Sequence, residues 1–199
     1  MLMKMLLGLV AAAVLLVQAP AQVVTQTYNI DPAHSSFAFS VRHLGINNVK
    51  GHFDEFAGKI VLADGAIKEA SSTIQVKSID TGVKMRDDHL RSADFFDADN
   101  HSVMTFKAKS VEKKDDKIVL VAEFTIRGVT KEVRLPVSLS GPVKDQEGKT
   151  RIGLEGKLVI NRKDYGIKFD ALLETGVALV GEEVSIQVDI EAVLEDGKK

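Results

Sequence analysis

The side chains best suited to acid–base chemistry lie in one short segment, MRDDHLRSADFF at residues 85–96. Asp87, Asp88, His89 and Arg91 bring carboxylates, an imidazole and a guanidinium close together, and these groups serve general acid–base catalysis. The sequence contains neither a G-x-S-x-G nucleophile motif nor a phosphate-binding loop. On a short amphipathic helix such charges usually form a solvated face, and acidic residues in the first turn suit the helix dipole. We therefore expect no catalytic residue. The alternative is an enzyme that uses this segment for catalysis.

The five histidines are the other candidates for chemistry, as metal ligands. His34, His43 and His52 are nine residues apart, which is no local ligand spacing, and the sequence has no H-x-x-x-H motif and no cysteine. We therefore expect no metal site and no cofactor. His43 stands at the end of an apolar face, where it is a candidate for hydrogen bonding to a ligand head group. A histidine bonded to backbone is the alternative.

These candidates lie among segments in which apolar and polar side chains alternate. The alternating segments are residues 37–42, 104–109, 120–126, 133–140, 151–160 and 184–191. A period of two predicts strands with one apolar face and one polar, solvent-exposed face. Turn residues such as Asp64-Gly65 and Arg127-Gly128 separate neighbouring segments at hairpin spacing. The sequence therefore predicts an all-β antiparallel fold of about eight strands, either a sandwich or a closed barrel.

Three segments interrupt the alternation. Residues 85–96 carry apolar side chains at roughly helical spacing, and residues 170–180 (DALLETGVALV) are good helix-forming material up to Gly176. We expect one or two short helices here that cover the ends of the β body. The third, NRKDYG at 161–166, is expected at a barrel end as well. Charged side chains would hold these covers in shape, namely Arg86, Asp87, Asp94, Arg162 and Asp164, with Arg162 paired to Asp164.

The N-terminal residues have the pattern of a secretory signal. One positive charge precedes an apolar run at 6–17, and Ala19-Pro20-Ala21 presents small side chains to a signal peptidase. The apolar run is short for a membrane span, which needs about 20 residues. We expect residues 1–21 to be a signal peptide cleaved after Ala21, and residues 22–199 to be a single periplasmic domain without stable membrane insertion.

Composition narrows the class of partner. Without Lys4, the chain from residue 22 has 25 basic residues (26 − 1) against 28 acidic residues, a net charge of −3. This near balance, without a Lys/Arg cluster, argues against a nucleic-acid partner. The absence of cysteine excludes disulfides, so the fold must rest on packing and backbone hydrogen bonds.

Four blocks of sequence, in order, resemble the YceI-like family between Tyr28 and Leu194. The blocks are YNIDPAHS at 28–35, GHF at 51–53, SIDTG with RDDHLRS and DFFD within 78–97, and NRKDYGI with LLETG within 161–176. After Asp97 the family usually has a Tyr-Pro pair, where this chain has Asn100-His101-Ser102. This departure changes the entry to one strand and does not affect the fold.

The resemblance implies a lipocalin-like antiparallel β-barrel, exported to the periplasm, that encloses an isoprenoid chain such as a polyprenyl lipid or the tail of a quinone. The resemblance is also compatible with a homodimer. The protein would then carry or sequester this lipid without chemistry. Two alternatives remain: a lipid-modifying enzyme that uses Asp87, His89 and Arg91, and a β-domain with a filled core that serves as an interaction module.

With such a ligand, the apolar phase of the strands lines the cavity and the polar groups near its mouth meet the head group. The expected wall residues are Phe37, Phe39, Val41, Phe53, Phe106, Leu120 and Phe124. The expected head-group or mouth residues are His43, Arg86, His89 and Arg162.

Overall fold

A computed structural model describes residues 22–115, 117–174 and 176–195. The predicted signal peptide, residues 1–21, lies outside the described residues. The strands are β1 (Thr25–Ile30), β2 (Ser36–His43), β3 (Asn47–Phe53), β4 (Phe56–Ala63), β5 (Ala66–Gln75), β6 (Ile79–Asp80), β7 (Val103–Lys114), β8 (Lys117–Ile126), β9 (Val129–Lys144), β10 (Thr150–Asn161) and β11 (Val180–Leu194). The helical elements are α1 (Lys84–Arg91) and the 3₁₀ turns η1 (Pro32–His34), η2 (Val76–Ser78) and η3 (Arg162–Tyr165).

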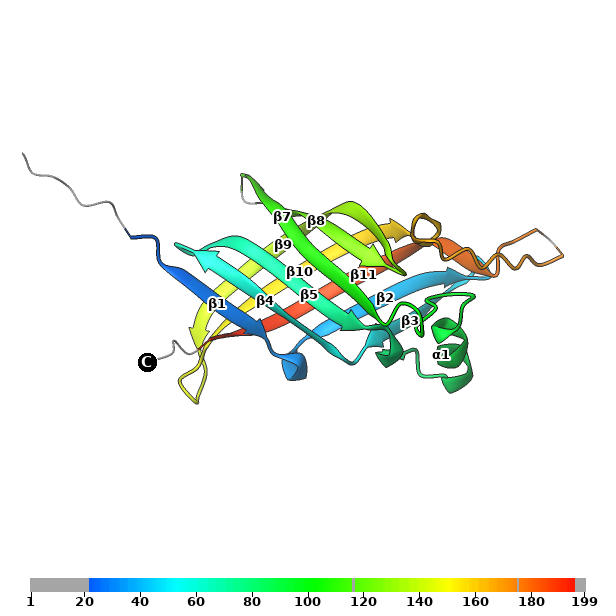
Figure 1. The fold of residues 1–199 in the computed structure, drawn as a ribbon, viewed down its shortest axis with the longest axis horizontal. Coiled ribbons are helices and arrows are strands. Elements are labelled where there is room, and N and C mark those ends of the chain that lie inside the picture. The colour runs from blue at the N-terminus through cyan, green and yellow to red at the C-terminus, as the bar shows by residue number, and fades with distance from the viewer. Residues whose placement is uncertain (1–21, 116, 175, 196–199) are drawn as a thin grey trace, which may run out of the picture.

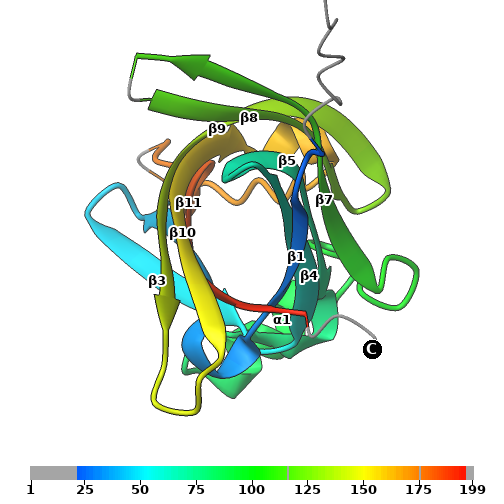
Figure 2. The same ribbon diagram turned by 90° about the vertical axis from the view of Figure 1, so that its left-hand side faces the viewer.

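Eight of these strands close into an antiparallel barrel. The order around the ring is β1-β4-β5-β7-β8-β9-β10-β11, and β11 pairs with β1 again through Tyr28 and Leu194. The view along the barrel in Figure 2 shows this ring. The other half of β11 pairs with β2, and β3 and β6 continue the sheet from there. The predicted all-β barrel of about eight strands is confirmed.

Alternation and turn chemistry account for the strands. In β8 the side chains of Leu120, Ala122 and Phe124 are buried on the inner face of the barrel, in the predicted phase. At the β8–β9 hairpin Arg127 and Gly128 have φ angles of 49° and 73°, the left-handed pair that a two-residue turn needs to match the twist of its strands.

Side chains fill the end of the barrel at which β1 closes against β11. Tyr28, Ile152 and Ala192 are almost completely buried there and pack with Leu62 and Val137 in the main core. None of these five side chains lines the cavity described below. The filled end therefore stabilises the closed ring and leaves the remaining length of the barrel for a cavity.

Of the one or two short helices expected, the described residues contain one, α1, and those between 170 and 180 form none. The segment is an irregular hairpin, in which the N–H of Leu173 donates to the carbonyl of Val177 and Leu172 forms a bridge with Ala178. Gly176, with a φ of 79°, lies in the turn of this hairpin, and the N–H of Leu44, just after β2, donates to the carbonyl of Leu179. Tertiary contacts thus override the helix propensity. In the described parts of the chain, α1 is the single α-helix, and no helix has the length and apolarity needed to cross a membrane.

Candidate functional site

An apolar cavity of about 160 Å³ lies inside the barrel. Its wall runs along β11 from Val180 to Ile190, which is about 33 Å of strand at about 3.3 Å per residue. A strand tilt of about 40° reduces this to about 25 Å along the barrel axis. The lining is therefore long relative to the volume, so the space suits a thin, chain-like molecule better than a compact one.

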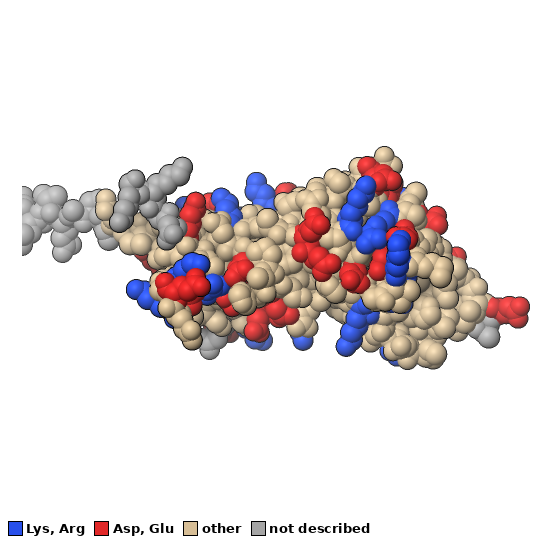
Figure 3. Space-filling view, turned by 90° about the horizontal axis from the view of Figure 1, so that it is seen from below, with Lys and Arg blue, Asp and Glu red and all other residues tan. Residues whose placement is uncertain are grey.

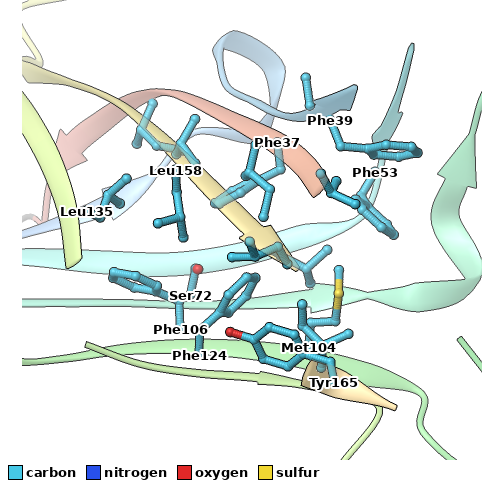
Figure 4. A pocket seen from close by; sticks show the side chains of 18 of the residues that line it. Phe37, Phe39, Phe53, Ser72, Met104, Phe106, Phe124, Leu135, Leu158 and Tyr165 are labelled. Atoms are coloured by element: carbon cyan, nitrogen blue, oxygen red, sulfur yellow. The ribbon is translucent and has the colours of Figure 1, made fainter. Parts of the chain in front are cut away.

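The seven wall residues expected from the sequence all line this cavity: Phe37, Phe39, Val41, Phe53, Phe106, Leu120 and Phe124. They come from β2, β3, β7 and β8, and Figure 4 shows five of them as labelled sticks around the space. The Phe39 and Phe53 rings lie 5.8 Å apart between centroids, and those of Phe106 and Phe124 lie 6.2 Å apart. Whether a ligand contacts them stays a prediction.

Further wall residues were not named from the sequence. Leu154, Leu158 and Ile186 continue the inward phase of β10 and β11, so the same alternation contained the signal for them. Ile60 and Ser72, from β4 and β5, complete the opposite wall. Those two strands carry less regular patterns, which is why the sequence reasoning passed over them.

Two irregular segments cap the cavity at the end opposite the filled core. Figure 1 shows α1 at the end where β11 begins. Leu90, Phe95 and Phe96 from the first segment line the cavity, and the Phe95 ring lies 4.7 Å from that of Phe169 in the second. Arg127 joins the two segments, because its guanidinium donates to the carbonyl of Gly166 at 2.6 Å and to that of Ala93 at 2.9 Å. The α1 segment and the segment after β10 therefore form one cap.

Arg162 is buried within this cap and joins parts of it by hydrogen bonds, an arrangement called the Arg162 clamp below. Its guanidinium donates to the carbonyls of Ile167 (2.7 Å), Gly181 (2.9 Å) and Val180 (3.2 Å). Its carboxylate partner is Asp170, at 3.4 Å, so the expected pairing with Asp164 is wrong. The reason is geometric: η3 is a tight turn, and the chain that follows it returns toward β11 past the guanidinium.

Asp87 is buried, which corrects the expectation of a solvated helix face at this position. Its carboxylate accepts hydrogen bonds from the backbone N–H of Thr81 at 2.9 Å and from the Thr81 hydroxyl at 2.5 Å. Arg86 donates to the same threonine, to its hydroxyl oxygen at 2.7 Å and its carbonyl at 2.8 Å. These bonds fasten α1 to the chain that leaves β6.

The other two mouth candidates stand outside the cavity wall. His89 has its Nε2 atom 3.1 Å from a carboxylate oxygen of Asp94, and its exposed ring lies edge-on to Phe95 and Phe169. His43 is the half-buried last residue of β2, where it pairs with Asn47 of β3. Of the four candidates only Arg162 lines the cavity. Their contacts with a head group stay predictions.

The interior nevertheless contains hydroxyl groups. Tyr165, at the end of η3, is almost fully buried on the cavity wall, and its hydroxyl has no hydrogen-bond partner among the described residues. Burial raises the pKa of this phenol to about 12, and the nearby Asp164 carboxylate adds to the shift. Ser72 also lines the cavity and is buried.

Outside the cavity, two groups of carboxylates and histidines in the described residues bring three ligand atoms within 4.8 Å of one another. In the group of Asp31, His34 and Glu191, Arg151 already supplies the positive charge through short ion pairs to both carboxylates. The other group, His52, Asp54 and Asp80, lies mostly in solvent. On the face shown in Figure 3, basic and acidic side chains are interspersed.

Comparison with known proteins identifies relatives that share the sequence and the fold of this chain. The family model of the YceI-like domain matches residues 28–192. A UPF0312 protein of Staphylococcus aureus strain N315 is 36% identical over 167 residues, which cover 82% of this chain and 95% of that protein. The YceI protein of Campylobacter jejuni is 30% identical, with a TM-score of 0.67 over 78% of this chain and 90% of that one.

Two more distant structures share the fold. Burkholderia cenocepacia BcnA is 23% identical, with a TM-score of 0.72 over 82% of this chain and 99% of its own. A polyisoprenoid binding domain from Saccharophagus degradans, implicated in plant cell wall breakdown, is 18% identical, with a TM-score of 0.62 over 84% of this chain and 98% of its own.

Proposed function

The chain belongs to the YceI-like family, and we propose that its barrel binds an isoprenoid lipid, either a polyprenyl chain or an isoprenoid quinone. The protein would carry or sequester this lipid in the periplasm without changing it. The observation that carries the proposal is the long apolar cavity, whose wall comes from strands far apart in the sequence.

Burial of hydrocarbon supplies the affinity in this proposal. Transfer of apolar surface from water contributes about 2.5 kcal/mol for each 100 Å². A branched hydrocarbon chain presents such surface along its whole length, and the Phe37, Phe39 and Leu158 side chains offer a matching wall. The related Saccharophagus degradans domain is described as polyisoprenoid binding, which supports the choice of ligand class.

The periplasmic location rests on the N-terminal sequence pattern. A positive n-region, an apolar run and Ala19-Pro20-Ala21 are typical of a secretory signal, so the mature chain would begin at Gln22. Sequencing the N-terminus of protein recovered from the periplasm tests this directly. An intact Met1 on membrane-bound protein would contradict the soluble-carrier proposal.

The contacts of the α1 segment favour a structural role over catalysis. The Asp87 carboxylate binds Thr81, His89 contacts Asp94 outside the cavity wall, and Arg91 donates to the carbonyls of Lys77 and Ile79. These groups are used to fix the cap and do not converge on the cavity. A lipid-modifying enzyme therefore remains the less favoured reading.

Native mass spectrometry with lipid extraction from the purified protein tests the proposed function. We expect an isoprenoid to co-purify with the wild-type protein. Leu158→Trp, which places a large ring on the inner wall, should abolish the bound mass, whereas Val159→Trp, on the exposed outer face, should retain it. Wild-type protein that stays empty in the presence of isoprenoids would support the filled-core interaction module instead.

A further inference from the structure

The Tyr165 hydroxyl is the unexplained polar group of the cavity. It is buried on a mostly apolar wall and has no hydrogen-bond partner among the described residues. Leaving a buried donor unpaired costs free energy, and native structures contain few such groups. The phenol is protonated at neutral pH, as a tyrosine ordinarily is, and burial raises its pKa further, to about 12. It therefore presents a hydrogen-bond donor.

The strand register places a second hydroxyl in line with this tyrosine. Ser72 of β5 is the register partner of Phe106 in β7, and Phe106 is the partner of Phe124 in β8. The Tyr165 ring packs on Phe124 with 6.0 Å between centroids. One row across the barrel wall thus begins with the Ser72 hydroxyl, passes over two aromatic rings and ends at the phenol.

Figure 4 shows the Tyr165 hydroxyl pointing toward the part of the cavity where Ser72, Phe106 and Phe124 lie. By contrast, the donors of Arg162 are occupied by backbone carbonyls of the cap. The polar group available for a ligand is therefore inside the barrel, at the level of the two phenylalanines. A ligand without polar atoms would leave this hydroxyl unpaired.

We propose that the Tyr165 hydroxyl donates a hydrogen bond to an acceptor oxygen of the bound lipid, so that the site selects isoprenoids that carry a carbonyl, such as prenylated quinones, over pure hydrocarbons. This inference rests on the proposed lipid-binding function and assigns the ligand's polar group to the barrel interior. The two rings beside the hydroxyls would stack against the flat quinone head. Tyr165 is then a specificity-determining residue.

The test compares two probes, a short-tailed ubiquinone and squalene, on wild-type protein and on Tyr165→Phe, by calorimetric titration in a fixed detergent. Loss of one net hydrogen bond should weaken ubiquinone binding by about three- to tenfold and leave squalene binding unchanged. Tyr28→Phe is the matched control, because Tyr28 is equally buried but lies in the filled end of the barrel. It should change neither affinity.

Two further readouts separate this role from a structural one. The ligand-free Tyr165→Phe protein should melt at the same temperature as the wild type or higher, because it loses an unpaired buried hydroxyl. The infrared carbonyl band of bound ubiquinone should move to lower frequency in the wild type and less in the variant. Equal weakening of both probes, or no change with either, would overturn the inference. If neither probe binds the wild-type protein, the proposed function itself fails.

Discussion

The Asp31 carboxylate lies 2.8 Å from the guanidinium of Arg151, across 120 residues of sequence. Asp31 follows directly after β1, and Arg151 lies near the start of β10, where it also pairs with Asp145 and Glu191. The pairing β1–β11 that closes the barrel runs beside this cluster, through Ile30 and Ala192. The ion pairs therefore tie together the strands at the seam of the ring.

This cluster should make barrel stability sensitive to acid. The hydrogen bond from Arg151 lowers the pKa of Asp31 from 3.8 to about 2, with a second contribution from His34. A lowered pKa stabilises the fold while the carboxylate is ionised, and this contribution is lost as the pH falls from about 4 through about 2. Arg151→Met should lower the melting temperature at neutral pH and flatten its dependence on pH in that window, as followed by circular dichroism.

Arg134→Met is the control for acid sensitivity, since Arg134 forms an exposed pair with Glu112. Such surface pairs contribute about 0–1 kcal/mol, so this variant should melt near the wild-type temperature. If Arg151→Met kept the wild-type slope between about pH 4 and pH 2, the assignment of Asp31 would be wrong.

The inward phase of β7 gives a second prediction. Phe106→Asp places an unpaired charge on the cavity wall and should abolish lipid retention and damage folding. Lys107→Asp changes the next residue, which is exposed on the outer face, and should do little. Lipid content by extraction and thermal melts measure both effects. Equal behaviour of the two variants would mean that the interior faces of the strands have been assigned incorrectly.

The sequence was sufficient for the strands because their period depends on local chemistry. Phe37, Phe106 and Leu120 each belong to a strand in which apolar and polar side chains alternate, and burial on one face of a sheet requires this pattern. The hairpin 170–180 was not predictable in the same way. Its residues favour a helix when considered alone, and the bond from Leu44 to the carbonyl of Leu179 that opposes it joins segments far apart in sequence.

The clamp formed by Arg162 gives a third prediction. Removing the guanidinium in Arg162→Met leaves the carbonyls of Ile167, Val180 and Gly181 without their donor. Unpaired buried groups cost about 1–3 kcal/mol each, and partial access of water reduces the sum, so we expect a loss of about 3 kcal/mol. Chemical denaturation measures it. Lys163→Met removes a half-exposed cation from the next position and should cost about 1 kcal/mol or less.

The roles of individual site residues were less accessible to sequence reasoning than the wall. Tyr165 lies in a turn after β10, where no periodicity indicates whether a side chain points inward. Asp87 looks like any helix-surface carboxylate, and its burial depends on Thr81 before the helix. Both positions are fixed by how irregular segments fold over the barrel end, and such contacts leave no pattern in the sequence.

The hydrogen bonds between Asp87 and Thr81 give the last prediction, which concerns the stability of the cap. Asp87→Ala removes an acceptor of two hydrogen bonds at a buried position and should cost about 1.5–3 kcal/mol in the free energy of unfolding. Because Leu90 and Phe96 of the same cap line the cavity, bound lipid should also dissociate faster. Stopped-flow transfer of a fluorescent lipid to vesicles measures that rate.

The neighbouring Asp88 is the control for Asp87, because it lies on the exposed side of α1 and forms surface ion pairs with Lys84 and Arg91, while Arg91 keeps its bonds to the carbonyls of Lys77 and Ile79 without it. Asp88→Ala should change the unfolding free energy by about 1 kcal/mol or less and leave lipid release as in the wild type. Neither variant should abolish a reaction, since the contacts of the α1 segment hold the cap in place. Multiple turnovers of a polyprenyl or quinone substrate, lost in His89→Ala at an unchanged melting temperature, would contradict the non-catalytic role of this segment and support a lipid-modifying enzyme.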